Sequence, residues 1–171
     1  RTWHAKVVVD ESFVTAGSSN NSMETRSAMA YWQNGKCIAH VSTQSHTFIV
    51  AKLAEFIGIP PDDLVVVAEY CGGGFGSKAR VLCEEIAIGM AAKRLGRPVR
   101  WVETRTEDML NLPHGRGQIH RIKIGGRRDG TVTAYSLDIT QDSGAYPLVA
   151  ARMPAGSSRM ATGVYHLPNV G

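Results

Sequence analysis

The spacing of apolar residues predicts two helices in the middle of the chain. Over residues 46–58, apolar side chains recur at positions i, i+4, i+7 and i+8 from Ile49, which is the pattern of one face of an amphipathic helix. Gly58 and the Pro60–Pro61 pair end this helix, because neither residue type continues helical backbone well. Residues 79–95 are also predicted to be helical, and their small side chains indicate close packing on several sides.

Extended segments alternate with these helices. A hairpin is predicted over residues 28–41, because apolar side chains alternate on both arms and Asn34-Gly35 between them suits a tight turn. A capping box, in which Thr104 is followed three residues later by Glu107, predicts a short helix over residues 106–112. The remaining predicted strands are residues 6–14, 64–68, 99–102, 119–124 and 131–139.

The order of these elements predicts one α+β unit. Strands and helices alternate as β-α-β-α-β in the centre, where a mixed sheet is expected, and antiparallel hairpins lie at both ends. The tail, residues 147–171, is punctuated by glycine and proline and is predicted to be loop with a short helix. Because no repeat, low-complexity segment or linker separates these parts, we interpret residues 1–171 as a single unit.

The composition mainly excludes classes of protein. Of the 171 residues, 43% are hydrophobic and 20% are charged, and no apolar run reaches the ~18 residues that a membrane-spanning helix needs. The net charge of +4 is scattered, which disfavours nucleic-acid binding. Cys37, Cys71 and Cys83 are odd in number and widely spaced, which favours a reducing compartment over a disulfide framework or a zinc site. We expect a cytoplasmic protein, with a periplasmic location left open, and a chain cut at both ends, since it begins at Arg1 without a leader.

The richest candidate for chemistry is the glycine-rich stretch 71–78, Cys-Gly-Gly-Gly-Phe-Gly-Ser-Lys. It follows a predicted buried strand and opens a predicted helix, so its amides are suited to an anion, although a strand-to-helix turn that needs positive φ explains the glycines equally well. Ser77 stands between Gly76 and Lys78, where a P-loop has its lysine directly after glycine. Ser77 also takes the last glycine position of a dinucleotide fingerprint, and the acidic residue, Glu103, comes about ten residues too late. Both nucleotide sites are disfavoured.

The same loop resembles the Gly-Gly-Gly-Phe-Gly-x-Lys motif of the molybdenum hydroxylases, the family of xanthine dehydrogenase, aldehyde oxidase and carbon monoxide dehydrogenase. Three further segments resemble the family in the right order: Ser-Met-Glu-Thr-Arg at 22–26, Val-Ser-Thr-Gln at 41–44 and Gly-Ala-Tyr at 144–146. Gln44 precedes Phe75 by 31 residues, which is also the family's separation. Because these matches cover nearly the whole chain, it is identified as part of the molybdopterin-binding large subunit.

This resemblance implies a molybdenum–molybdopterin cofactor, with the cytosine dinucleotide as one form of it. Its metal is held by pterin sulfur and by oxo or sulfido ligands, so no protein side chain is expected to ligate it. The family's glutamine, which hydrogen-bonds the apical oxo ligand, corresponds to Gln44. The loop's cofactor-binding residues correspond to Gly74, Phe75, Gly76 and Ser77. Phe75 is expected to form an apolar wall, and the N–H groups of Phe75 and Gly76 are expected to polarise oxygen ligands.

The resemblance also implies what the chain does not carry. The family's general base, a glutamate in a Gly-x-Gly-Glu segment, has no match here, so no catalytic residue is predicted within the chain. Purine-oxidising relatives have a glutamate after the loop lysine, and Ala79 in that place makes purines poor substrates. Glu24 belongs to a family segment, but an ion pair with Arg26 explains it equally well. The helix dipole alone explains Glu84 and Glu85.

The parent reaction, by resemblance, hydroxylates aldehydes or heteroaromatics with water as the oxygen source. Two electrons would leave through iron–sulfur clusters, and often FAD, on other domains or subunits of an oligomer. Two other functions stay open. One is an α/β domain that binds an anion or a nucleotide phosphate through the Gly72–Gly76 loop, and the other is a non-catalytic scaffold relative.

Overall fold

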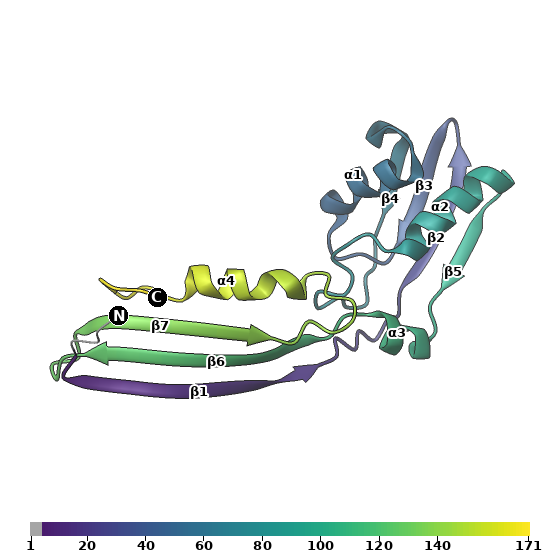
Figure 1. Cartoon of the computed structure of the whole chain (residues 1–171). Helices are drawn as coiled ribbons and strands as arrows, with labels where there is room; N and C mark the ends of the chain where they lie inside the picture. Colours follow the sequence, from purple (N-terminus) through teal and green to yellow (C-terminus); the bar gives the residue numbers. More distant parts are fainter. Residues whose placement is uncertain (1–4) are drawn as a thin grey trace. The chain divides into compact units, whose positions relative to one another are not determined.

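Backbone pairing groups the chain into two compact units (Figure 1). The computed structural model describes residues 5–171. One unit is formed by residues 20–112, and the other by the residues before and after that segment. The division arises because strand β1 (Val7–Ser18) pairs with the distant strand β6 (Gly115–Gly126). The structure therefore divides what the sequence analysis treats as a single unit, whereas the predicted α+β class is confirmed.

The unit of residues 20–112 is built on a four-stranded mixed sheet in the order β4-β3-β2-β5. Strands β2 (Ser27–Gln33) and β3 (Lys36–Val41) form the predicted hairpin, and both residues of its Asn34-Gly35 turn have positive φ, 52° and 77°. The other two strands lie outside this hairpin: β4 (Leu64–Val67) runs parallel to β3, and β5 (Val99–Val102) runs antiparallel to β2.

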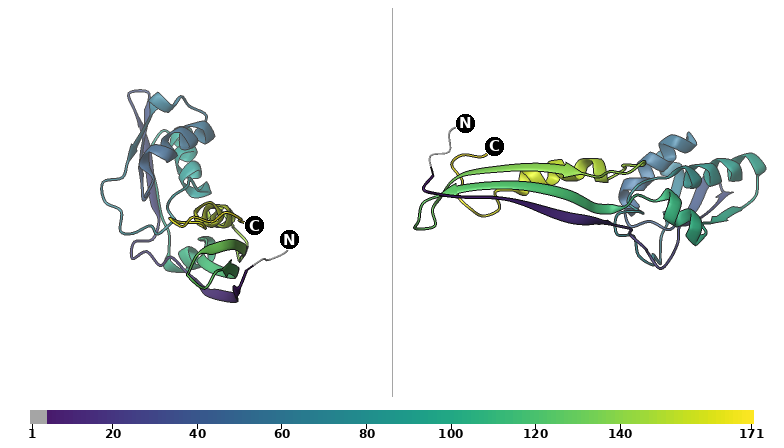
Figure 2. Two further views of the ribbon diagram at one scale, coloured as in Figure 1. Left: turned by 90° about the vertical axis from the view of Figure 1, so that its left-hand side faces the viewer. Right: turned by 60° about the horizontal axis from the view of Figure 1, so that its bottom comes forward.

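Two helices, α1 (His46–Ile57) and α2 (Cys83–Leu95), cover one face of this sheet (Figures 1 and 2). The alternation along the hairpin explains the core, since alternate residues of β2 and β3 face the helices; all of these are buried except Trp32, which is partly buried against the core. The core consists of Ala28, Ala30, Cys37, Ala39, Val41, Ile49, Leu53, Ala54, Ile57, Leu64, Val66 and Ala92. A short helix, α3 (Arg105–Asn111), follows β5 and has the predicted capping box at Thr104, and a 3₁₀ turn, η1 (Pro61–Asp63), precedes β4.

The second predicted helix begins later than expected. Residues 75–78 form a turn and α2 starts only at Cys83, after a bent segment. Its first turn is closed by the Glu85 carboxylate, which accepts a hydrogen bond from the Leu82 N–H at 3.0 Å. The glycine loop therefore does not open the helix, and the positive end of the helix dipole does not lie at this loop. The prediction that a helix N-terminus helps this loop to bind an anion is therefore wrong.

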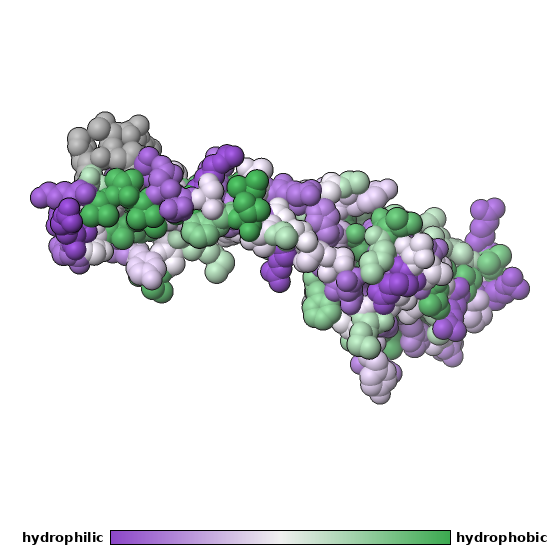
Figure 3. Space-filling model, turned by 90° about the horizontal axis from the view of Figure 1, so that it is seen from below, coloured by the Kyte–Doolittle hydropathy of each residue, from purple (hydrophilic) through white to green (hydrophobic). Residues whose placement is uncertain are grey.

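The other unit is a three-stranded antiparallel sheet in the order β1-β6-β7, with β7 spanning Val132–Gln141. After a 3₁₀ turn, η2 (Ala150–Arg152), helix α4 (Met153–Met160) packs along β7 (Figure 2). Every residue of β1 is exposed, and Figure 3 shows apolar patches on this unit. The exposed apolar side chains of β1 and β6 are Val7, Val8, Val9, Phe13, Val14 and Ile119.

Candidate functional site

The glycine loop is a tight turn that holds a phenylalanine in a strained conformation. The Ser77 N–H and hydroxyl both donate to the Gly74 carbonyl oxygen, at 2.9 and 2.7 Å. The two central residues of the turn, Phe75 and Gly76, have φ of 50° and 103°. Left-handed backbone costs a residue with a side chain about 1–2 kcal/mol, and this side chain is also 73% exposed. Such strain at a solvent-facing aromatic residue is typical of a functional site.

Gln44 lies directly against this turn. Its side-chain oxygen Oε1 accepts a hydrogen bond from the Gly76 N–H at 2.9 Å, and its backbone N–H donates to the Lys78 carbonyl oxygen at 3.1 Å. A Cβ atom added to Gly74 would lie only 2.2 Å from Oε1, so the loop approaches Gln44 as closely as glycine permits. Gln44 and the loop residue Phe75 are 31 residues apart in the sequence, and the fold brings Gln44 and the loop into contact.

This arrangement leaves the amide nitrogen of Gln44 as a donor. Because Oε1 is held by Gly76, the amide orientation is set, and Nε2 has no partner among residues 5–171. The Phe75 N–H is likewise without a backbone or side-chain acceptor within that range. An exposed, oriented amide donor beside an aromatic wall fits a ligand that presents oxygen acceptors, which is what the oxo ligands of a molybdenum cofactor would present.

Two other predicted loop residues have their polar groups engaged within the chain. The Gly76 N–H donates to Gln44, so in this structure it is not available to polarise an oxygen ligand. The Ser77 side chain is 1% exposed and its hydroxyl closes the turn, so it shapes the loop from within. Ala79 is half-buried just after the turn. The neighbouring Arg80 guanidinium lies 4.5 Å over the Phe48 ring.

An ion pair between buried Lys78 and partly buried Glu24 lies beneath the loop, and no pattern in the sequence predicts it. The Lys78 side chain is fully buried, and its Nζ donates to the Glu24 carboxylate oxygen Oε2 at 2.8 Å and to the Glu24 carbonyl oxygen at 2.9 Å. Partial burial would raise the pKa of Glu24, but the hydrogen bonds from Lys78 and Ser42 outweigh it and lower that pKa. Glu24 thus pairs with Lys78, and the suggested pair with Arg26 is wrong.

Arg26 instead joins three elements in the interior. Its guanidinium donates to Glu103 at the end of β5, with Nε 3.1 Å from Oε2, and to Glu84 in the first turn of α2 at 3.0 Å. Burial alone would lower the pKa of Arg26, but the hydrogen bonds to Glu103 and Glu84 raise it above its usual range. The helix dipole is therefore not the whole explanation of Glu84. Burial raises the pKa of the neighbouring Glu85 to about 7.

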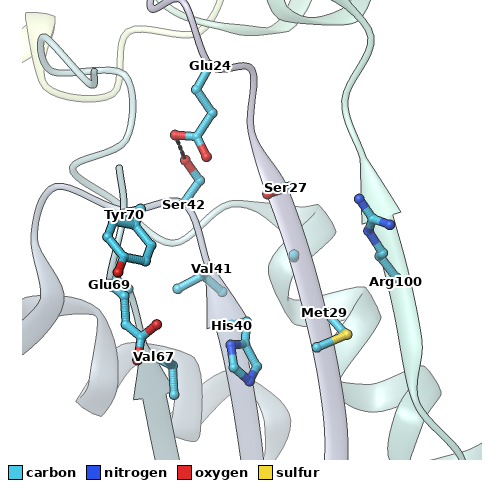
Figure 4. Close-up of a pocket in the computed structure, with 12 residues that line it drawn as sticks. Glu24, Ser27, Met29, His40, Val41, Ser42, Val67, Glu69, Tyr70 and Arg100 are labelled. Carbon is cyan, nitrogen blue, oxygen red and sulfur yellow. Dashed lines mark hydrogen bonds between the residues drawn. The ribbon is translucent and has the colours of Figure 1, made fainter. Parts of the chain in front are cut away.

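A cavity of about 390 Å³ lies on the sheet face opposite the helices (Figure 4). Glu24 and Ser42, joined by a 2.8 Å hydrogen bond, form part of its wall, and Figure 4 shows His40, Glu69 and Arg100 on the neighbouring strands and loop. Neither Gln44 nor Phe75 lines this cavity, so the predicted cofactor-binding residues do not face it.

Two kinds of structural feature are absent from residues 5–171. No group of three or more His, Cys, Asp and Glu side chains is arranged to hold a metal ion. Within the same described range, no helix combines the length and apolar character that crossing a membrane requires. The three cysteines are unpaired.

The last of the segments that resemble the family, Gly144–Tyr146, belongs to the unit of the three-stranded sheet. There the Gly144 N–H donates to the Asp142 carboxylate at 2.9 Å.

Comparison with known proteins gives consistent matches. A family model described as the molybdopterin cofactor-binding domain matches residues 2–171. The large subunit of nicotine 6-hydroxylase from Paenarthrobacter nicotinovorans is 34% identical over 85% of this chain and 19% of its own length. An indole-3-acetaldehyde oxidase from Arabidopsis thaliana is 36% identical over 72% of this chain and 10% of its own length. The chain thus spans a fifth or less of these relatives.

Solved structures agree in fold. Quinoline 2-oxidoreductase from Pseudomonas putida 86 superposes with a TM-score of 0.85 and 31% identity, over 98% of this chain and 22% of that chain. CO dehydrogenase from Oligotropha carboxidovorans superposes with a TM-score of 0.83 and 25% identity, over 98% of this chain and 21% of that chain.

Proposed function

Because this chain belongs to the molybdopterin cofactor-binding domain family, we propose that it forms one wall of a molybdenum cofactor site in a hydroxylase. The observation that carries the proposal is the oriented amide of Gln44 beside the strained, exposed Phe75. The whole enzyme would hydroxylate an aldehyde or a heteroaromatic carbon with water as the oxygen source. When bound, the cofactor supplies the two-electron redox chemistry, and this chain supplies the surroundings that orient it.

The roles of the residues follow from their geometry. Gln44 Nε2 donates to an oxygen ligand of the metal, since its Oε1 is already held by the Gly76 N–H. Phe75 packs its exposed ring against the cofactor and excludes water from that side. The Phe75 N–H is a second donor, while Gly74 and Ser77 set the shape of the turn. The cofactor's form, including the cytosine dinucleotide, and the iron–sulfur and FAD partners on other domains or subunits belong to the same proposal, as do an oligomeric state and a cytoplasmic location.

Gln44→Ala in the complete enzyme tests this function. Loss of one preorganised donor should reduce turnover on the order of a hundredfold, while folding and molybdenum content stay unchanged. Gln33→Ala is the matched control, because Gln33 is also an exposed glutamine and lies at the hairpin end of β2. Wild-type turnover of Gln44→Ala with full molybdenum loading would refute the assignment.

Metal analysis of the same purified enzyme separates the two alternatives. Molybdenum close to one atom per chain supports the proposal, bound nucleotide without molybdenum would support a phosphate-binding domain, and the absence of both would support a scaffold. No observation in the structure favours those alternatives, since the glycine loop does not open a helix.

The substrate class is proposed from Ala79, together with relatives named for nicotine, quinoline and indole-3-acetaldehyde. A methyl side chain cannot hydrogen-bond a purine ring, so the polar edge of a purine would be desolvated without compensation. Aldehydes or simpler heteroaromatics should therefore react with a higher kcat/KM than xanthine. Ala79→Glu should raise kcat/KM for xanthine relative to the aldehydes. A clear preference of the wild-type enzyme for xanthine would overturn this substrate assignment.

A further inference from the structure

Lys78 is attached to the surrounding structure at both its main chain and its side chain. Its carbonyl oxygen accepts hydrogen bonds from the Gln44 N–H and the Thr43 hydroxyl, both at 3.1 Å. Its ammonium group lies in the interior with 0% of the side chain exposed, and both of its hydrogen bonds go to Glu24. An ammonium group without exposure needs a partner, because an unpaired buried charge is strongly destabilising. The position of Lys78 is therefore tied to the position of Glu24.

One oxygen of Glu24 accepts hydrogen bonds from both segments that make up the site. Oε2 accepts hydrogen bonds from Ser42 Oγ at 2.8 Å, from the Gly72 N–H at 2.7 Å and from Lys78 Nζ at 2.8 Å. Ser42 lies two residues before Gln44, while Gly72 is near the start of the glycine loop and Lys78 is its last residue. The backbones also meet here, since the Glu24 N–H donates to the Gly72 carbonyl oxygen at 3.2 Å.

Gly72 shows how closely these parts fit. A Cβ atom added there would lie 2.5 Å from the Glu24 Cβ, so the loop contacts the Glu24 side chain closely. The contacts of Glu24 and Lys78 therefore define the distance between the strand end that bears Gln44 and the turn that bears Phe75.

We propose that Glu24 and Lys78 are a positioning pair, which sets the orientation of the Gln44 amide and of the Phe75 turn relative to each other. The proposal rests on the proposed function, because it gives the pair a role in the hydroxylation reaction. The pair acts through Gln44 and the turn and does not touch the reacting atoms. Its loss should alter kcat and the surroundings of the metal more than substrate binding.

Two variants of the complete enzyme test the pair. Glu24→Gln keeps an oxygen acceptor for Ser42 and Gly72 and removes the charge that holds Lys78, while Lys78→Met removes the ammonium group at similar length. Lys52→Met and Glu55→Gln are the matched controls, because Lys52 and Glu55 form an exposed ion pair of similar length, 2.7 Å, on α1. Molybdenum content, kcat, KM, the electron paramagnetic resonance spectrum of Mo(V) and hydrogen exchange of peptides covering residues 71–78 are measured for each.

We expect both site variants to retain molybdenum, to lose kcat by about tenfold or more with little change in KM, and to show an altered Mo(V) spectrum. Hydrogen exchange of the loop should be faster, because without the ion pair the loop is held less firmly and the hydrogen bonds of the Gly72 and Gly76 amides open more often. The control variants should behave like wild type. The double variant Glu24→Gln/Lys78→Met should be no worse than Lys78→Met alone, since both changes break one interaction.

Wild-type kcat and an unchanged Mo(V) spectrum in Glu24→Gln, with the loop exchanging as in wild type, would overturn the proposal. Glu24→Gln leaves the buried Lys78 ammonium without its carboxylate and is the variant whose folding is more at risk. If one of the two variants does not fold, the other alone decides between the two results by the same measurements. If the wild-type enzyme contains no molybdenum, the proposed function fails. In that case, if the loop of Glu24→Gln exchanges as in wild type, the positioning role is refuted as well. Faster exchange of the loop would instead show that the pair holds the loop in place.

Discussion

Gly74 offers the sharpest test of how the glycine loop positions Gln44. An alanine Cβ at this place would lie 2.2 Å from Gln44 Oε1, 2.9 Å from Cδ and 3.1 Å from Cβ of Gln44. Side-chain atoms do not tolerate contacts below 3.0 Å, so Oε1 would have to move by at least 0.8 Å. The φ of Gly74 lies outside the left-handed range, so alanine suits the backbone and the perturbation is steric. The 2.9 Å hydrogen bond from the Gly76 N–H would break as Gln44 rotates.

The expected magnitudes separate stability from activity. One neutral hydrogen bond contributes about 1 kcal/mol, and Gln44 is exposed, so water can replace the lost partner. Gly74→Ala should therefore change the thermal midpoint of the enzyme by only a few degrees. Displacement of a catalytic donor by about 1 Å is enough to reduce turnover on the order of a hundredfold. Activity should fall far more than stability.

The assay compares four versions of the complete enzyme: wild type, Gly74→Ala, Gln44→Ala and the double variant, each with its molybdenum content measured. Because both changes act through the Gln44 amide, the double variant should be no less active than Gln44→Ala. Gly156→Ala is the control, since an added Cβ there meets nothing within 4 Å. Full activity of Gly74→Ala, or a further large loss when it is added to Gln44→Ala, would refute this reasoning.

Two further predictions concern the support of the site. Burial raises the pKa of Glu85 to about 7, so its stabilising contribution, on the order of 3 kcal/mol, is full below pH 4.5 and is lost as the pH rises through 7. Glu85→Gln should remove this pH dependence from the hydrogen-exchange protection of α2, and an unchanged dependence would contradict the assignment. Gly89→Ala places a Cβ 2.5 Å from Ile57 Cδ1 and should destabilise the α1–α2 contact by about 1–3 kcal/mol, as measured by urea unfolding. Ile57→Val removes Cδ1 and should restore most of that loss, whereas no rescue would show that the contact is not the cause.

Elements with a strong local pattern are the ones that the sequence predicts. The helix over 46–57, the hairpin with its Asn34-Gly35 turn and the Thr104 capping box each depend on residues close together in the chain. The pairing of β1 with β6 has no such signal, because its partners lie about a hundred residues apart. The late start of α2 was missed for a related reason. Residues 79–82 suit a helix locally, but the turn at Phe75 and the Glu85 cap on Leu82 place the first helical residue at Cys83.

The partners of the buried charges could not be predicted either. Glu24 and Arg26 are neighbours in sequence, yet each pairs with a distant residue, Glu24 with Lys78 and Arg26 with Glu84 and Glu103. Since spacing along a loop does not determine which charges share the interior, the fold decides the pairing. Only the resemblance to a family placed Gln44 and the loop at one cofactor site, and their direct contact was not predicted, because no periodicity connects positions 31 residues apart.

The buried residues of the loop stabilise it, whereas its exposed residue Phe75 is strained. Left-handed backbone at Phe75 opposes folding by about 1–2 kcal/mol, and its exposed ring gains little from burial in this chain. Contacts beneath the turn offset this strain, namely the two hydrogen bonds from Ser77 to Gly74 and the charged hydrogen bonds between Lys78 and Glu24. A charged hydrogen bond contributes about 1.5–3 kcal/mol, which is comparable to or larger than the strain. Stability thus comes from the buried side of the loop and allows the exposed side to hold an aromatic ring and an amide donor in a conformation that suits a ligand.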